Sequence, residues 1–176
     1  MKKILLCTVI VLFTWLNTKA QEIKYGAKAG VDFSSLKVKN RVFSITNNET
    51  GFYVGGFAEI GVFKAVAFRP ELLYIAVKDL NQISVPLMAK YEVSEDFNVL
   101  AGPSFGFLLN VNDGFKSFNY GIEFGVAYDI YISRFIDGLF VEARYNIGLS
   151  NLLEEAPSGL TRKLNGLFVG LGYKFK

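Results

Sequence analysis

Apolar and polar residues alternate along almost the whole chain after residue 21. Alternation with a period of two is typical of β-strands, because successive side chains point to opposite sides of a sheet. In the first such run Tyr25, Val31 and Phe33 share one face, whereas Lys24 and Lys28 share the other. The pattern predicts eight strands, which are Ile23–Phe33, Phe52–Val62, Ala67–Val77, Ile83–Val93, Phe97–Leu109, Phe118–Ile130, Leu139–Leu149 and Leu167–Phe175.

The charges of these eight runs all fall on one face, and the opposite face is apolar from end to end. Each run has roughly ten residues, which is the length that a tilted strand needs to cross a bilayer. We therefore expect the apolar face to contact lipid and the mixed face to line a lumen. The fold class predicted is all-β, an eight-stranded antiparallel up-and-down transmembrane β-barrel.

The links between the predicted strands alternate in length. The stretches Ser34–Gly51 and Asn151–Lys163 are long, whereas Phe63–Val66 and Ser94–Asp96 are short. Outer-membrane barrels combine long outer loops with short periplasmic turns, so both termini are expected in the periplasm. Aromatic residues near the strand ends predict two interfacial girdles, one of Tyr25, Phe68, Tyr91, Tyr128 and Tyr173, the other of Phe33, Phe52, Tyr74 and Tyr120.

The first twenty residues have the pattern of a secretory signal peptide. Lys2 and Lys3 precede an apolar run over residues 4–16, and Thr18 and Ala20 form a small-x-small ending. The apolar run is too short for a spanning helix, which needs about 20 residues. We expect cleavage after Ala20, which leaves residues 21–176 as a single barrel domain.

Removal of residues 1–20 changes the charge and the chemistry of the chain. The whole chain has 19 Lys and Arg against 16 Asp and Glu, and three of the lysines lie before residue 21. The remainder is balanced at 16 against 16, so no basic patch indicates nucleic-acid binding. The chain has no His, and its one Cys, Cys7, precedes the cleavage site. Disulfides, Cys-type zinc sites and His-based acid–base catalysis are thereby excluded from the barrel.

The inward face contains six basic and seven acidic side chains, which are the candidate site residues. Buried charges persist only when they are paired and hydrogen-bonded, and eight strands enclose a space just wide enough for side chains. A salt-bridge network that plugs the barrel is therefore favoured over a polar path for ions or small solutes. The candidates are Lys24, Lys28, Arg69, Lys90, Arg144 and Lys174 with Asp32, Glu59, Glu71, Glu92, Glu123, Asp129 and Glu142.

Three prolines lie inside predicted strands, at Pro70, Pro86 and Pro103. Proline has no N–H to give to a neighbouring strand, so each is expected to remove one ladder bond, at a bulge.

Four segments, in their order along the chain, resemble the PorT-like outer-membrane β-barrel family, whose members are often labelled porin family protein. They are Phe68-Arg-Pro-Glu-Leu-Leu-Tyr74, Val85-Pro-Leu-Met-Ala-Lys-Tyr91, Ala101-Gly-Pro-Ser104 and Glu142-Ala-Arg-Tyr-Asn-Ile-Gly-Leu-Ser-Asn151. The resemblance implies an integral outer-membrane barrel in which the three prolines recur. It implies no substrate, and the secretion role of the namesake does not follow from these motifs.

The sequence thus predicts a non-enzymatic barrel of the Gram-negative outer membrane, with no cofactor and no metal. Its expected partners are outer-membrane lipid, the insertion machinery during biogenesis and an unidentified ligand of the outer loops. Two alternatives remain open at this point. The first is a narrow porin-like channel for ions or small solutes, and the second is a soluble lipocalin-like periplasmic binder whose apolar face points inward.

Overall fold

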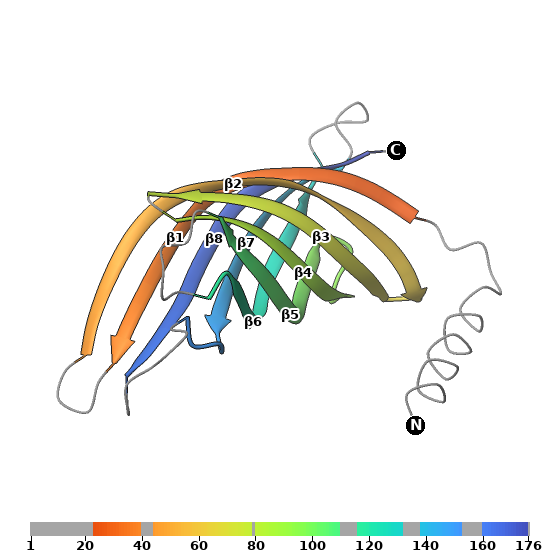
Figure 1. The fold of residues 1–176 in the computed structure, drawn as a ribbon. Coiled ribbons are helices and arrows are strands. Elements are labelled where there is room, and N and C mark those ends of the chain that lie inside the picture. The colour runs from red at the N-terminus through yellow and green to blue at the C-terminus, as the bar shows by residue number, and fades with distance from the viewer. Residues whose placement is uncertain are drawn as a thin grey trace, which may run out of the picture.

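The computed structural model describes residues 23–39, 44–78, 80–109, 116–131, 138–152 and 160–175, and these form eight strands. Each strand is antiparallel to its neighbours, and β1 pairs with β8, which closes the sheet into a barrel (Figure 1). The predicted fold class is confirmed. The strands are β1 Ile23–Lys39, β2 Ser44–Phe63, β3 Val66–Val77, β4 Leu80–Glu92, β5 Phe97–Leu109, β6 Phe118–Ile130, β7 Leu139–Gly148 and β8 Thr161–Phe175.

The two ends of the barrel differ. One end, called the terminal end below, contains Ile23, Phe175 and the turns β2–β3 and β4–β5. The other, called the hairpin end, contains the β1–β2 hairpin, where β1, β2 and β8 run past the remaining strands (Figure 1). Within the described ranges, no helix has the length and the apolarity needed to cross a bilayer.

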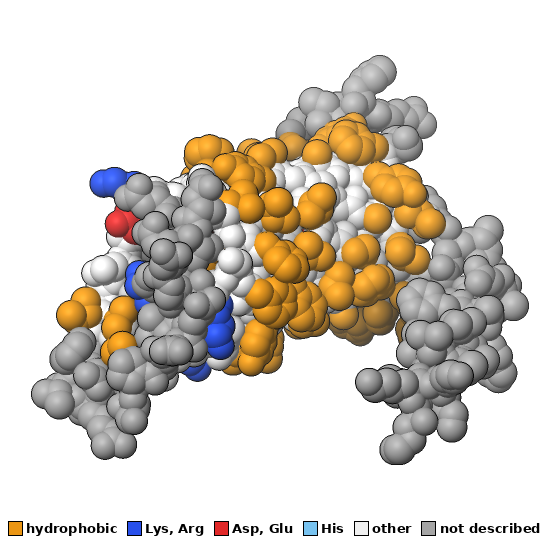
Figure 2. Space-filling model, viewed as in Figure 1, with side chains coloured by type: hydrophobic (Ala, Val, Ile, Leu, Met, Phe, Trp, Pro, Cys, Tyr) orange, Lys and Arg blue, Asp and Glu red, His pale blue; other side chains and the backbone are white. Residues whose placement is uncertain are grey.

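Apolar side chains cover the outside of the barrel wall, and polar side chains are enclosed by it. Val54, Ile122 and Leu171 are about half exposed, whereas Arg69 and Arg144 are only 1% exposed. Figure 2 shows the hydrophobic side chains as a broad band across the face of the wall in view. An exposed apolar band around a polar interior is the pattern of a membrane barrel and the reverse of a soluble protein. The lipocalin-like alternative required the opposite orientation and is wrong.

The predicted aromatic girdles also lie on the outside. All nine of their side chains are exposed, from Tyr173 at 37% to Tyr25 and Phe52 at 59%. At the hairpin end, the ring of Phe118 lies 5.3 Å from that of Phe107 and 6.4 Å from that of Tyr120. Clustered outward rings at strand ends suit the boundary between hydrocarbon and water.

The stretch Ser34–Gly51 is not a loop, and this prediction is wrong. β1 continues to Lys39 and β2 begins at Ser44, with unbroken pairing between them from Ser34 opposite Glu49 to the hairpin tip. The link Asn151–Lys163 is shorter than predicted for the same reason, because β8 begins at Thr161. β8 follows β1 along this whole extension. Beyond the barrel wall the hairpin end therefore has a three-stranded sheet.

The three prolines lie inside strands, but none sits at a bulge. Pairing is interrupted between β2 and β3 beside Pro70, between β3 and β4 beside Pro70 and Pro86, and between β4 and β5 beside Pro86 and Pro103. The same register resumes beyond each gap, so the missing N–H groups cost ladder bonds without shifting the strands. Among the described residues the register shifts only between Gly61 and Phe63, next to the β2–β3 turn. The predicted proline bulges are wrong.

The expected signal peptide, residues 1–20, lies outside the described residues. The same holds for most of the predicted link Asn151–Lys163.

Candidate functional site: the barrel lumen

Six of the predicted site residues meet in the middle of the lumen and form one network of ion pairs, called the central network below. Strands β1, β3, β6 and β7 supply them, and every side chain is at most 2% exposed. Three are cationic and three anionic, so the charges of the set balance. They are Lys28, Arg69, Arg144, Glu71, Glu123 and Glu142.

Glu71 accepts contacts from all three cations of the central network. Its Oε2 lies 2.5 Å from Lys28 Nζ and 2.8 Å from Arg144 Nη1, and its Oε1 lies 3.1 Å from Arg69 Nε. Glu142 repeats this arrangement, at 2.9 Å from Lys28, 3.2 Å from Arg144 and 3.3 Å from Arg69. Each carboxylate is thus shared among several cations, which offsets part of the cost of removing these charges from water.

Glu123 and its neighbours extend the central network by hydrogen bonds toward the hairpin end. Glu123 Oε1 lies 2.6 Å from Arg144 Nη1, and its other oxygen accepts from the Asn146 side chain at 3.4 Å. Asn146 also donates to the Ser104 hydroxyl. Asp32 is fully buried near this level, but its described hydrogen-bond partner is Ser34, at 2.6 Å, and it does not join the central network.

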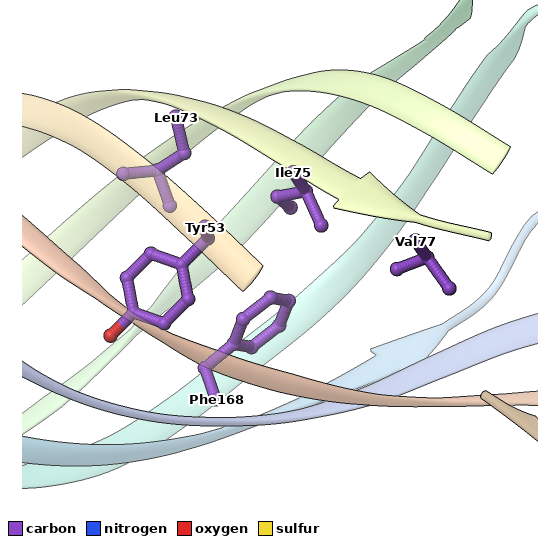
Figure 3. Packing of buried hydrophobic residues seen from close by; sticks show 5 residues of the cluster. All are labelled: Tyr53, Leu73, Ile75, Val77 and Phe168. Carbon is purple, nitrogen blue, oxygen red and sulfur yellow. The ribbon is translucent and has the colours of Figure 1, made fainter. Parts of the chain in front are cut away.

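Two apolar clusters lie on either side of the central network, and sequence reasoning did not include them in the site. The first, called the hairpin-side cluster, contains Tyr53, Leu73, Ile75, Val77 and Phe168 (Figure 3). The rings of Tyr53 and Phe168 meet edge to face at 5.5 Å between centroids. Arg144 lies 5.8 Å from the Phe168 ring, and Tyr53 donates its hydroxyl proton to Glu142 at 3.3 Å. The cluster therefore rests directly on the central network.

The second group, called the terminal-side cluster, contains Phe57, Met88, Leu100, Ala127 and Phe140. The guanidinium of Arg69 lies 3.9 Å from the centroid of the Phe57 ring and 5.0 Å from that of Phe140. Such cation–π contacts stabilise a desolvated arginine. All five residues are at most 5% exposed, so a second buried apolar cluster lies on the terminal side of the central network.

Glycines opposite the lumen rings make room for them. Gly26 is the partner of Phe57 across β1 and β2, and Gly172 is the partner of Phe140 across β7 and β8. A Cβ at either glycine would clash with the facing ring. An aromatic ring packed over a cross-strand glycine is a recurrent device of barrels. The inward glycines at these positions therefore accommodate aromatic rings.

Five further predicted site residues lie near the terminal end. Lys90 pairs with Glu59 at 2.5 Å and approaches Glu92 at 3.5 Å, and Lys174 pairs with Asp129 at 2.7 Å. They line a cavity of about 800 Å³ that also includes Lys24 at the rim. Lys24 is exposed and does not belong to the central network. The lumen is thus open to solvent at this end and filled further in.

The described lumen residues offer fixed charges but no assembled catalytic or metal site. Among the described residues no group of three or more metal-ligating side chains occurs. The carboxylates of the central network are engaged by cations, and the serines near it bond to Asp32 and Asn146. The arrangement places three cations and three carboxylates in contact with one another in the middle of the lumen.

Comparisons with known proteins agree with the fold. A family described as "Outer membrane protein beta-barrel domain" matches residues 79–154, which is less than half of the chain. No curated protein matches the sequence. Neisserial surface protein A is similar in structure, with a TM-score of 0.52 and 14% identity over 89% of this chain and all of that one.

Two other solved structures give lower scores. Ail, the attachment invasion locus protein of Yersinia pestis, has 12% identity and a TM-score of 0.48, over 86% of this chain and 99% of that one. The N-terminal β-barrel domain of Pseudomonas aeruginosa OprF has 15% identity and a TM-score of 0.44, over 88% of this chain and all of that one.

The class of protein follows from the closed eight-stranded barrel, its exposed apolar band and the family match over residues 79–154. The chain is an outer-membrane β-barrel protein and is located in the cell outer membrane, in contact with its lipid. The family match supports the outer-membrane part of the resemblance noted above. The narrower PorT-like assignment stays a prediction.

Proposed function

We propose that this protein is a non-enzymatic outer-membrane barrel with a sealed lumen, and that it acts at the cell surface through its hairpin end. The proposal includes cleavage of residues 1–20, membership of the PorT-like group and passage through the outer-membrane insertion machinery. The hairpin end faces the exterior and the terminal end faces the periplasm, in keeping with the length of the β1–β2 hairpin and the short turns opposite to it.

The observation that carries the sealed lumen is the stacking of three layers across it. The central network is bounded on one side by the hairpin-side cluster and on the other by the terminal-side cluster. Arg69, Arg144, Met88 and Phe140 are at most 1% exposed, so water reaches none of these layers freely. A continuous polar path would require removal of both apolar layers.

The hairpin end supplies the surface for interaction. Its three-stranded sheet, formed by β1, β2 and β8, projects past the barrel wall (Figure 1). The side chains of residues 45–50 are exposed. A rigid sheet presents side chains at fixed spacing, which suits recognition of a partner better than a coil does.

Single-channel recording in planar lipid bilayers tests the sealed lumen. The wild-type protein is expected to show no discrete current steps. The double variant Arg144→Ala/Glu71→Ala serves as the matched comparison, because it keeps the charges of the central network balanced while removing side-chain bulk. Discrete openings of the wild type, altered in size by this double variant, would contradict a sealed lumen and favour the second candidate, a narrow channel. The terminal-end cavity of about 800 Å³ is the observation that supports this second candidate.

A further inference from the structure

Two lysines face each other on the outside of the extended sheet at the hairpin end. Lys37 on β1 is the direct cross-strand partner of Lys163 on β8. Like charges directly opposite each other on one face destabilise a sheet. Neither lysine forms an ion pair with any of the described residues. The pair therefore places two positive charges side by side without compensation from the described part of the protein.

The lysine pair continues the lipid-facing surface. Lys37 follows Val31, Phe33 and Ser35 at every second position of β1, and Lys163 precedes Asn165 and Leu167 in the same way on β8. Phe33 is the cross-strand partner of Leu167, and both are exposed at the edge of the apolar band that is nearer the hairpin end. Figure 2 shows Lys and Arg side chains gathered beyond this band at the hairpin end.

The distance from the apolar band matches the headgroup layer of a bilayer. Lys37 lies four positions after Phe33, which is about 13 Å along a strand and about 10 Å along the membrane normal for a strand tilted by ~40°. Lysine side chains reach several ångströms along a surface toward the interface. The two ammonium groups can therefore meet groups that lie just above the hydrocarbon.

The described surroundings of the lysine pair are polar, and none of the described residues on this face is acidic. The cross-strand partners of Lys37 and Ser35 on β2 are Thr46 and Asn48, which supply hydroxyl and amide donors. Glu49 alternates to the opposite side of β2. Ammonium groups combined with hydroxyl and amide donors are the groups that proteins use to bind phosphate.

We propose that Lys37 and Lys163 together bind a phosphate group of an anionic lipid in the outer leaflet of the membrane. The phosphate neutralises the repulsion between the lysines, and the acyl chains of the same lipid cover the apolar wall below Phe33 and Leu167. This inference takes the hairpin end as the exterior end, as proposed above. Lipid A binding and single-channel conductance are independent measurements, so failure of the lipid site and failure of the sealed lumen can be told apart.

Thermal unfolding in bilayers of defined composition tests the lipid site. Protein purified from outer membranes is reconstituted into phosphatidylcholine alone or with 20 mol% of bisphosphorylated lipid A, and Tm is read from loss of the compact band on gels. Lipid A is expected to raise the Tm of the wild type by about 5 °C, because a ligand of the native state stabilises it. The double variant Lys37→Gln/Lys163→Gln should lose at least half of this rise.

The same variant distinguishes lost binding from lost folding. In phosphatidylcholine alone its Tm should equal or exceed that of the wild type, because the repulsion between the lysines is gone. The matched control is Lys78→Gln/Lys116→Gln, which removes two exposed positive charges of the hairpin end outside the lysine pair and should behave like the wild type. An equal rise of Tm in the Lys37/Lys163 variant and in the wild type would overturn the proposal. An equal rise with inorganic phosphate in place of lipid A would overturn the lipid as ligand.

Discussion

At the scale of single residues, the contribution of a lumen charge to the stability of the barrel depends on how fully that charge is buried and paired. A buried charge that loses its partner costs several kcal/mol, whereas an exposed pair contributes little. Glu71 touches three cations with its side chain fully buried, and Glu92 touches Lys90 with its side chain half exposed. The two glutamates therefore differ in their expected effect on stability although both lie on the inward face.

Replacement of Glu71 with Ala is expected to lower the free energy of unfolding by about 3–5 kcal/mol, because it leaves Lys28, Arg69 and Arg144 with one anionic partner fewer. Replacement of Glu92 with Ala should change it by less than about 1 kcal/mol. Urea unfolding in lipid vesicles measures both values. Equal losses in the two variants would show that the central network does not hold the barrel together.

A second residue-scale prediction concerns the glycines beneath the lumen rings. The change Gly172→Ala places a methyl group against the Phe140 ring, which is fully buried. We expect a loss of about 1–3 kcal/mol in the free energy of unfolding, as for other overpacked cores. The control Gly56→Ala adds its methyl group on the outer face at ordinary contact distance, and its stability should stay near that of the wild type. If both alanines are tolerated equally, the aromatic packing is looser than described.

The sequence predicts the charged residues of the lumen but not its aromatic residues, as Phe140 and Phe168 illustrate. Their charged neighbours Glu142 and Arg144 stood out because charge in an otherwise apolar strand is informative. The two phenylalanines lie on the same inward face but were not included, because an apolar residue in a lipid-facing protein carries no signal of its own. Their position opposite glycine was the available clue, and it becomes readable only when the register between strands is known.

At the scale of elements, strands are predicted well where the membrane imposes the pattern. β5 and β6 begin and end at the predicted residues, because their apolar positions face lipid along their full length. The ends of β1 and β2 were missed. Beyond the bilayer the outer face meets water, so Ser35 and Lys37 point outward, and Leu36 and Val38 alternate to the other side. The apolar face has changed sides, and a search for a lipid-facing stripe ends at Phe33.

Hydrogen–deuterium exchange tests the hairpin extension. Residues 45–50 pair with β1 on one side only, so every second amide proton points to a partner. If these residues form a paired strand, those amide protons should exchange at least about ten times more slowly than those of a free coil. Those of Glu95 and Asp96, in the β4–β5 turn, provide the unprotected reference within the same protein. Mass spectrometry of peptic peptides from the reconstituted protein gives both rates. Equal rates in the two segments would restore the loop that the sequence predicted.

At the scale of the whole molecule, the barrel reverses the usual distribution of side chains. Its charges are neutralised inside by a balanced set of ion pairs, and its apolar surface is left for lipid. The hydrophobic gain therefore depends on the bilayer, and the polar interior fixes which face each strand turns inward. Shifting one strand by one residue would bury its apolar set and expose its charges to lipid. The central network and the lipid contact thus select the same register.

If the outer face of the barrel contacts lipid, a charge placed on that face should destabilise the whole barrel. Ile122→Arg and Val126→Arg each place a charge on the outer face of β6, where the native side chains are 49% and 40% exposed. Arginine near the bilayer midplane of a barrel costs about 2–4 kcal/mol, and the cost falls toward the interfaces. Asn47→Arg, on the exposed sheet beyond the apolar band and on the side opposite to the lysine pair, should cost less than about 1 kcal/mol. Unfolding in vesicles measures all three variants, and a graded loss that follows depth in the membrane is expected. A loss at Asn47 as large as that at Val126 would mean that these substitutions report on strand pairing, and the position of the bilayer along the barrel would then have to be assigned anew.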